Sequence, residues 1–361
     1  MPAARTTFKE HRSYTSYRTY TLLATTFSCC CIFLLNGCGS APKAFTLHGE
    51  ALGTFYTISI AEPPAAMSEA NAKRLADSAL DRVNRLMSTY LEDSELSRFN
   101  RYEGAAPFQL SGETYKVFEA AQTIAEQSGG AFDVTVGPLV NAWGFGPEAL
   151  QHPPDAAAIN ALLERVGYQK LTLHPENKIS KARPDLYCDL SAIAKGYAVD
   201  AVTEVFEEAG IRNYMVEVGG EIRVSGKNAH GLDWTLGIES PKPGVRDLRT
   251  AVRIGQEALA TSGDYRNMYE LEGRLVSHTI DPHTGYPVPH ALASVSVIHP
   301  SCMWADGYAT ALMALGPEKA AAFAREHDLA VMLLVHDAEA NHFREVSTPQ
   351  FDVCRVEPSG Q

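Results

Sequence analysis

Asp306 and Thr310 have the spacing in this 361-residue chain that points most directly to chemistry. They stand four positions apart, so a helix starting near Asp306 would place their oxygens on one face. Paired hard oxygen donors suit Mg²⁺, which keeps open positions for substrate phosphate. A helix cap followed by an ordinary helical threonine explains the same pair without a metal. The metal interpretation requires the main-chain oxygen of Ala192 to reach the same point.

The run from Asp189 to Asp200, DLSAIAKGYAVD, combines a carboxylate, small residues and a lysine. An extended stretch ends at Asp189 and a helix follows, so unpaired backbone N–H groups at the helix start form an anion site. Lys195 adds a positive charge nearby. The structural alternative makes Asp189 a helix cap and Lys195 a surface charge.

His278 stands directly before a strong turn motif, DPHTG at 281–285. An imidazole at this place can take a proton from an attacking hydroxyl, and Asp281 is near enough to orient it. The alternative is a histidine with a purely structural role.

Two further segments carry small residues beside predicted strands. Ser262 and Gly263 follow an apolar strand in ATSGDY, which predicts a turn where backbone approaches a ligand closely. An ordinary hairpin turn is the alternative. The glycine pair in 217–223 joins two strands and lacks the Gly-x-Gly-x-x-Gly pattern of dinucleotide sites. A serine hydrolase built on Ser262 or Ser277 would lack the Gly-x-Ser-x-Gly elbow.

Hydrophobic periodicity predicts the elements that must position these residues. Predicted helices are 69–87, 112–128, 155–166, 194–209, 306–315 and 317–327; predicted strands are one within 45–61 and 170–173, 213–218, 234–238, 257–261, 294–297 and 330–334. Helices and strands mix without strict alternation. The pattern favours an α+β or mixed α/β fold in a single large domain, and not a Rossmann fold.

The first 40 residues differ in composition from the rest. A basic start precedes fifteen uncharged residues at 21–35, which is short for a membrane span but typical of a secretory signal. Small residues directly before Cys38 resemble the lipobox of bacterial lipoproteins. We predict a signal peptide over 1–37, lipid-modified Cys38 opening a tether over 38–44, a domain over 45–345 and a tail over 346–361. A simple signal peptide cleaved elsewhere, or an uncleaved anchor, is the alternative.

The formal net charge of −12 argues against nucleic-acid binding, which requires clustered Lys and Arg facing phosphates. An anionic ligand would need local help, such as a metal. Three dispersed cysteines beyond the signal, at 188, 302 and 354, form neither a disulfide framework nor a zinc-ligand spacing.

The order of the motifs resembles the ApbE family. DLSAIAKGYAVD, VGGEI, ATSGDY, SHTIDPHTG and ADGYATAL follow one another, and LGTFY, MSTY with DSELSRFN, and GAFDVT precede them. The resemblance covers roughly 45–340. It implies an ApbE-like fold and transfer of the FMN half of FAD onto a Thr or Ser hydroxyl of a partner protein, with a phosphoester formed and AMP released.

The resemblance also implies roles for single residues. Asp306, Thr310 and the main-chain oxygen of Ala192 would hold Mg²⁺, and His278 would act as base, with Asp281 sharing that role. FAD contacts are implied for Leu52, Tyr90, Ala131, Phe132, Asp133, Asp189, Lys195, Ser262, Gly263 and Thr279. The sequence departs from the family at three places. Ser191-Ala192 stands where Gly-Gly is common, Thr279 stands where Ile is usual, and Leu52 stands where Met is frequent.

Partners and place follow from the same resemblance. The acceptors would be membrane redox subunits that carry covalent FMN, and the lipid at Cys38 would hold the enzyme on the periplasmic side of the inner membrane. Because Gly39 and Ser40 follow the cysteine, the outer membrane remains an alternative location for the lipoprotein. Two alternatives remain: a Mg²⁺-dependent FAD pyrophosphatase giving FMN and AMP, and a non-catalytic flavin- or solute-binding lipoprotein that releases no AMP.

Overall fold

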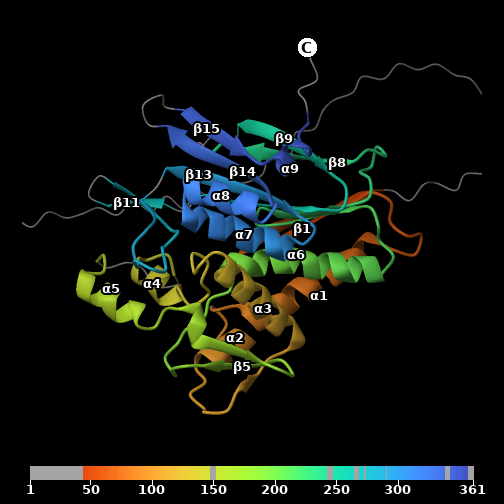
Figure 1. The fold of residues 1–361 in the computed structure, drawn as a ribbon. Coiled ribbons are helices and arrows are strands. Elements are labelled where there is room, and N and C mark those ends of the chain that lie inside the picture. The colour runs from red at the N-terminus through yellow and green to blue at the C-terminus, as the bar shows by residue number, and fades with distance from the viewer. Residues whose placement is uncertain are drawn as a thin grey trace, which may run out of the picture. The chain divides into compact units, whose positions relative to one another are not determined.

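An eight-stranded antiparallel sheet organises the domain (Figure 1). The computed structural model describes residues 44–146, 152–241, 247–263, 268–271, 274–289, 291–337 and 342–356. The strand order is β1-β2-β6-β7-β10-β13-β14-β15. The bounds are β1 Phe45–Ala51, β2 Thr54–Ile60, β6 Tyr214–Val218, β7 Glu221–Ser225, β10 Ala258–Gly263, β13 Leu292–His299, β14 Ala330–Asp337 and β15 His342–Ser347.

Long helices cover one face of this sheet and form the largest core with it (Figure 1). They are α1 Glu69–Met87, α3 Gly112–Gln127, α6 Ser191–Glu208, α7 Cys302–Leu315 and α8 Pro317–Glu326. Helix α1 shows why such a segment folds: Ser68 caps its start by accepting from Asn71 N, and its buried residues recur at helical spacing. Helices α6 and α7 lie at the centre and carry most of the predicted chemistry.

The opposite face of the sheet is covered by a hairpin and the C-terminal segment. Strands β8 Trp234–Glu239 and β9 Leu248–Ile254 pair with each other, and α9 Pro349–Asp352 packs beside them. Phe351 of α9 is fully buried in this second core. The predicted domain boundary at residue 345 therefore falls inside β15, and the described part of the predicted tail belongs to the fold.

A third, smaller core supports the segment that contains His278. Helices α4 Gly137–Ala142 and α5 Ala156–Leu163 pack Leu139, Trp143 and Ile159 against Ile280. Strands β11 Met268–Leu271 and β12 Arg274–Ser277 lead into this segment. The remaining elements are α2 Glu95–Asn100, the 3-10 turn Tyr168–Lys170, and a small sheet of β3 Phe108–Gln109, β5 Lys178–Lys181 and β4 Leu171–His174.

Most predicted elements are confirmed. The predicted starts of two helices are wrong, however. Helix α6 begins at Ser191 rather than 194, and α7 at Cys302 rather than 306. The start of α7 is held by a local cap and by a tertiary contact. Ser301 accepts a hydrogen bond from Trp304 N, and Asp200 of α6 accepts hydrogen bonds from the main-chain N of Cys302 and Met303. The mixed α/β fold class is confirmed.

Two predicted turns and strands also need correction. Ser262 and Gly263 do not form a turn: they lie inside β10 and pair with Val295 and Ser294 of β13. The strand within 45–61 is a hairpin that turns at Leu52 and Gly53, both with positive φ. Residues 1–43 lie outside the described residues, as do 264–267. In the part of the chain that the structure describes, no helix is long and apolar enough to span a membrane.

Candidate active site

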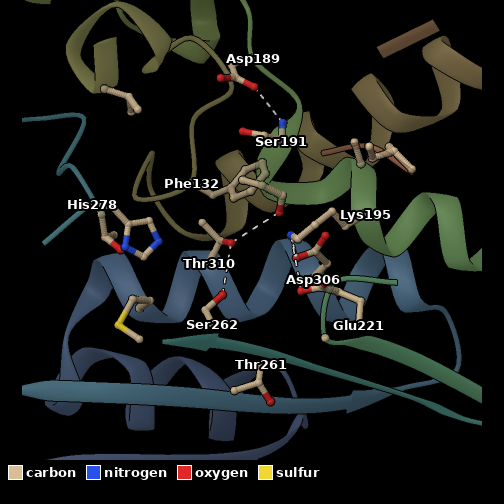
Figure 2. Close-up of a pocket in the computed structure, with 18 of the residues that line it drawn as sticks. Phe132, Asp189, Ser191, Lys195, Glu221, Thr261, Ser262, His278, Asp306 and Thr310 are labelled. Carbon is tan, nitrogen blue, oxygen red and sulfur yellow. Dashed lines mark hydrogen bonds and ion pairs between the residues drawn. The ribbon is translucent and has the colours of Figure 1, made fainter. Parts of the chain in front are cut away.

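One cavity of about 980 Å³ gathers the predicted site residues. Its walls come from α6, α7, β10, the loop after α3 and the segment around His278 (Figure 2). Of the predicted residues within the described ranges, Asp281 is the exception that does not line it. Those that do are Leu52, Tyr90, Ala131, Phe132, Asp133, Asp189, Ala192, Lys195, Ser262, Gly263, His278, Thr279, Asp306 and Thr310.

Helices α6 and α7 bring the three proposed metal ligands together. The Thr310 hydroxyl donates to the main-chain oxygen of Ala192 over 3.4 Å, and its oxygen lies 3.4 Å from Ser262 Oγ. One turn earlier in α7, Asp306 Oδ2 accepts from Gly196 N at 2.9 Å. Asp306 is thus on the second turn of α7, where the i and i+4 side chains reach the same stretch of α6.

These residues fit a magnesium ion by the chemistry of their donors. A carboxylate, a hydroxyl and a main-chain carbonyl are hard oxygen ligands, and they line a cavity with room for further ligands. Within the described ranges no group of three or more His, Cys, Asp or Glu side chains could hold a metal.

A buried charge cluster lies beside this donor set. Lys195 Nζ is 3.6 Å from Asp306 Oδ1 and 3.4 Å from Glu221 Oε1 (Figure 2). Burial lowers the pKa of Lys195, but the two carboxylates outweigh burial and raise that pKa above its ordinary value. Burial raises the pKa of Asp306, against the opposing effect of Lys195.

Glu221 belongs to the site, although the glycine pair before it was only a weak signal in the sequence. It opens β7 directly after the Gly219-Gly220 turn, and its side chain is almost fully buried. Burial raises the pKa of Glu221 to about 8, with Asp306 adding to the rise and Lys195 opposing it. The glycine pair has positive φ at both positions, which fits the tight turn that delivers Glu221 to the cavity.

The loop after α3 supplies an apolar wall. Ala131 and Phe132 are buried and line the cavity, whereas the carboxylate of Asp133 is already occupied by the protein. Its Oδ1 accepts from Thr135 N and Oγ1, and its Oδ2 accepts from Tyr168 N at 2.7 Å. Burial raises the pKa of Asp133. Asp133 thus fixes the loop, and its predicted contact with a ligand stays a prediction.

Three predicted contacts lie at the edges of the cavity. Tyr90 is 71% exposed, and Ser88 Oγ holds its main-chain N at 3.1 Å. Asp189 accepts from Ser191 N at 2.9 Å in the turn before α6, which agrees with a cap-like role as much as with ligand binding. Leu52 stands at the tip of the β1–β2 hairpin.

His278 faces the cavity, with the ring of Phe145 6.2 Å away edge-on. The carboxylate of Asp281 points to its own turn: Oδ1 accepts from His283 N at 2.9 Å and Oδ2 from Thr284 Oγ1 at 3.0 Å. Between the residues that the structure describes, no hydrogen bond or ion pair joins Asp281 to His278. The predicted orientation of His278 by Asp281 is therefore not seen.

A family model described as "ApbE family" matches residues 52–333, which is most of the chain. The chain belongs to the ApbE family. A protein from Vibrio cholerae named FAD:protein FMN transferase is 42% identical over 321 residues, which cover 89% of this chain and 95% of the relative. A relative of the same name from Escherichia coli K12 is 39% identical over 86% of this chain and 89% of its own.

A solved ApbE structure agrees with this fold as well. The flavin transferase ApbE from Vibrio cholerae, in a variant with a histidine replaced by glycine, superposes with a TM-score of 0.80 at 41% identity. The match covers 87% of this chain and all of that one. Ala192 would contribute only its main-chain oxygen to a metal, so its side chain, where glycine was expected, does not remove that donor. Thr279 lines the cavity without replacing a polar group.

Proposed function

We propose that this chain is a Mg²⁺-dependent FAD:protein FMN transferase that attaches FMN to a Thr or Ser hydroxyl of a partner protein. The observation that carries the proposal is the meeting of Asp306, Thr310 and the Ala192 carbonyl in one cavity that also contains His278. Membership of the ApbE family supports the same reaction. A pyrophosphate-containing donor suits a cavity of this volume.

Asp306, Thr310 and the main-chain oxygen of Ala192 would hold Mg²⁺, which supplies positive charge beside the pyrophosphate of FAD. The protein itself is acidic, so this local charge matters for binding an anion. Lys195 remains ammonium between its two carboxylates, and its raised pKa keeps a second positive charge in the same wall. Phosphoryl transfer depends chiefly on such positioning and neutralisation of charge.

His278 is the group that would take the acceptor's proton. The hydroxyl oxygen of the acceptor attacks the phosphorus of the FMN half, and the bond to the AMP phosphate oxygen breaks. A ring nitrogen of His278 accepts the hydroxyl proton, and AMP leaves with the electron pair of the broken bond. The ring lies at the opposite side of the cavity from the buried charge cluster, and Phe145 packs against its edge.

Phe132, Ala131 and Tyr90 would position the aromatic parts of FAD. Phe132 and Ala131 present a buried apolar wall, and Tyr90 presents an exposed ring at the rim. Aromatic side chains of this kind stack on planar ligands and exclude water from them. Restricting water access favours transfer to a protein hydroxyl over hydrolysis.

We further propose that the lipid on Cys38 holds the enzyme on the periplasmic side of the inner membrane, close to membrane redox subunits that serve as acceptors. The uncharged run at 21–35 followed by a small-residue site supports this anchor. Cys38→Ser tests it: the variant should leave the membrane fraction. A variant that is still recovered with lipid attached would contradict the anchor.

The dependence of AMP release on an acceptor tests the proposed reaction. The mature protein is incubated with FAD and Mg²⁺, with and without a peptide that carries a Thr acceptor, and AMP is quantified. Transfer predicts AMP only when the peptide is present. AMP at the same rate without it would mean hydrolysis of FAD, and no AMP in either sample would mean a binding protein.

A further inference from the structure

A second histidine, His283, joins two walls of the cavity. Its Nδ1 lies 3.1 Å from Asp281 Oδ1, and its Nε2 lies 3.0 Å from the main-chain oxygen of Gly129. Asp281 belongs to the segment that carries His278, whereas Gly129 directly precedes the loop with Ala131 and Phe132. The side chain of His283 is 59% exposed, so it contributes little to the core.

The protons of this bridge define its chemical state. A main-chain carbonyl and a carboxylate are acceptors, so each ring nitrogen must present an N–H. A neutral imidazole has one N–H and can make only one of the two bonds, whereas the imidazolium makes both. Asp281 is the charged group that faces the ring in the described part of the chain, and the ring of Tyr168 borders the adjacent Gly130.

The loop on the Gly129 side is shaped for this contact. Gly129 and Gly130 both have positive φ, which turns the chain at the end of α3. A Cβ on Gly130 would lie 3.2 Å from His283 Nε2, so a side chain there would displace the ring. The absence of that side chain lets His283 approach the main chain directly.

The other end of the His278 segment is anchored independently. Trp143 Nε1 donates to the main-chain oxygen of Gly285 at 2.8 Å, which ties the turn to α4. A Cβ on Gly285 would lie 2.5 Å from Ile159 of α5, so the turn packs tightly against both helices. The turn at 281–285 is thus fixed to α4 and α5. The hydrogen bond between His283 and Gly129 connects this turn to the loop that carries Ala131 and Phe132.

We propose that His283 is a positioning residue that bridges Asp281 and Gly129 and thereby holds His278 at its working distance from the FAD-binding loop. The inference rests on the proposed function. His283 does not touch the reacting atoms; it acts through the two walls that it connects. Misplacement of a base by a fraction of an ångström costs rate steeply.

Three substitutions test the bridge by the number of N–H donors they keep. His283→Ala keeps none, His283→Gln keeps two that both lie on one nitrogen, and His283→Arg keeps several on separate nitrogens at every pH. His230→Gln serves as control, because His230 is an exposed histidine of the β7–β8 loop, away from the cavity.

We expect His283→Ala to lower kcat and weaken FAD binding, each on the order of tenfold, with the Mg²⁺ concentration for half activity unchanged. His283→Arg should recover most of both losses, and His283→Gln should fall between. Full activity and FAD affinity in His283→Ala, or no recovery in His283→Arg, would overturn the proposal. Recovery in His283→Arg would also show that the loss in His283→Ala comes from the missing hydrogen bonds and not from misfolding.

Failure of the proposed function gives a different pattern. If the unmodified protein produces no flavinylated peptide, the transferase assignment fails. The affinity of each variant for FAD then still tests the bridge. Weaker FAD binding in His283→Ala that recovers in His283→Arg would then support it. Equal affinities in all variants would overturn it.

Discussion

Gly196 and Asp306 meet where α6 and α7 cross, with the main-chain N–H of Gly196 donating to Asp306 Oδ2 over 2.9 Å. A Cβ on Gly196 would lie 2.3 Å from the main-chain oxygen of Cys302. Each turn of α6 pairs with a turn of α7 in the same register: Ala192 with Thr310, Gly196 with Asp306, and Asp200 with Cys302. This antiparallel ladder sets the position of Asp306 and Thr310, the two side chains proposed to bind the metal.

Gly196→Ala should therefore damage both stability and the site. The added methyl group meets backbone that cannot move cheaply, so we expect a loss of about 1–3 kcal/mol in the free energy of unfolding. Separation of the helices should also raise the Mg²⁺ concentration needed for activity. Urea denaturation and Mg²⁺ titration measure the two effects.

Gly112→Ala is the matched control for Gly196→Ala. Gly112 opens α3, and its nearest neighbour to an added Cβ would be 3.7 Å away. Alanine is the better helix former by about 1 kcal/mol. A Gly196→Ala protein as stable and active as Gly112→Ala would show that the close approach of α6 and α7 is unimportant.

Asp306→Ala should abolish Mg²⁺-dependent turnover, because it removes the one carboxylate of the proposed donor set. Thr310→Val removes a neutral ligand and should weaken metal affinity by roughly 10- to 100-fold while preserving shape. Binding of Mn²⁺, followed by electron paramagnetic resonance, measures metal affinity independently of enzyme activity. Glu326→Ala on the exposed face of α8 is the control. Unchanged Mn²⁺ binding in Asp306→Ala would remove this metal site.

Glu221 makes the metal-free protein less stable as pH rises. Its pKa is about 8 in the folded protein, mainly through burial, against about 4.3 for an exposed glutamate. Between these values the unfolded chain releases a proton that the folded protein retains, so stability falls by at most about 1.4 kcal/mol per pH unit. The loss ends above the folded pKa.

Glu221→Gln removes that contribution, so its urea midpoint with EDTA present should fall less between about pH 5 and 8 than that of the unmodified protein. The difference between the two proteins reports Glu221 together with its interaction with Lys195 and Asp306. Parallel pH dependences in the two proteins would contradict a raised pKa at Glu221.

Trp143→Phe should lower kcat through the turn that carries His278. The substitution leaves the main-chain oxygen of Gly285 without its indole partner, at about 1–3 kcal/mol of stability. Trp234→Phe is matched, because Trp234 Nε1 donates to Ser225 O on the hairpin side of the sheet. We expect both variants to lose stability and only Trp143→Phe to lose kcat. An equal loss of kcat in both would assign the effect to stability alone.

Periodicity and local motifs predicted much of the fold. Helix α1 occupies the predicted 69–87, because its apolar face and the Ser68 cap are both local signals. The predicted start of α7 was one turn too late, because the local cap at Ser301 was overlooked. The hydrogen bonds that Asp200 accepts there come from a residue about a hundred positions away in sequence. Ser262 and Gly263 were misread because small residues favour turns locally, whereas pairing with β13 keeps them in a strand.

The sequence predicted which residues line the cavity better than it predicted their hydrogen-bond partners. Motif order placed most of its residues in one cavity, including the carbonyl of Ala192. It could not foresee that the carboxylate of Asp133 is used by Thr135 and Tyr168, or that Asp281 turns toward His283. Those partners are chosen by side-chain direction and by packing between segments, which spacing along the chain does not encode.

The mass of an acceptor peptide after reaction tests the central claim most directly. The mature protein is incubated with FAD, Mg²⁺ and a Thr-containing peptide, and with the same peptide carrying Val in place of that Thr; peptide mass and AMP are measured in each sample. The account predicts a gain of one FMN phosphoester on the Thr peptide, an equal amount of AMP, and no gain on the Val peptide. An unmodified Thr peptide, with or without AMP, would contradict it.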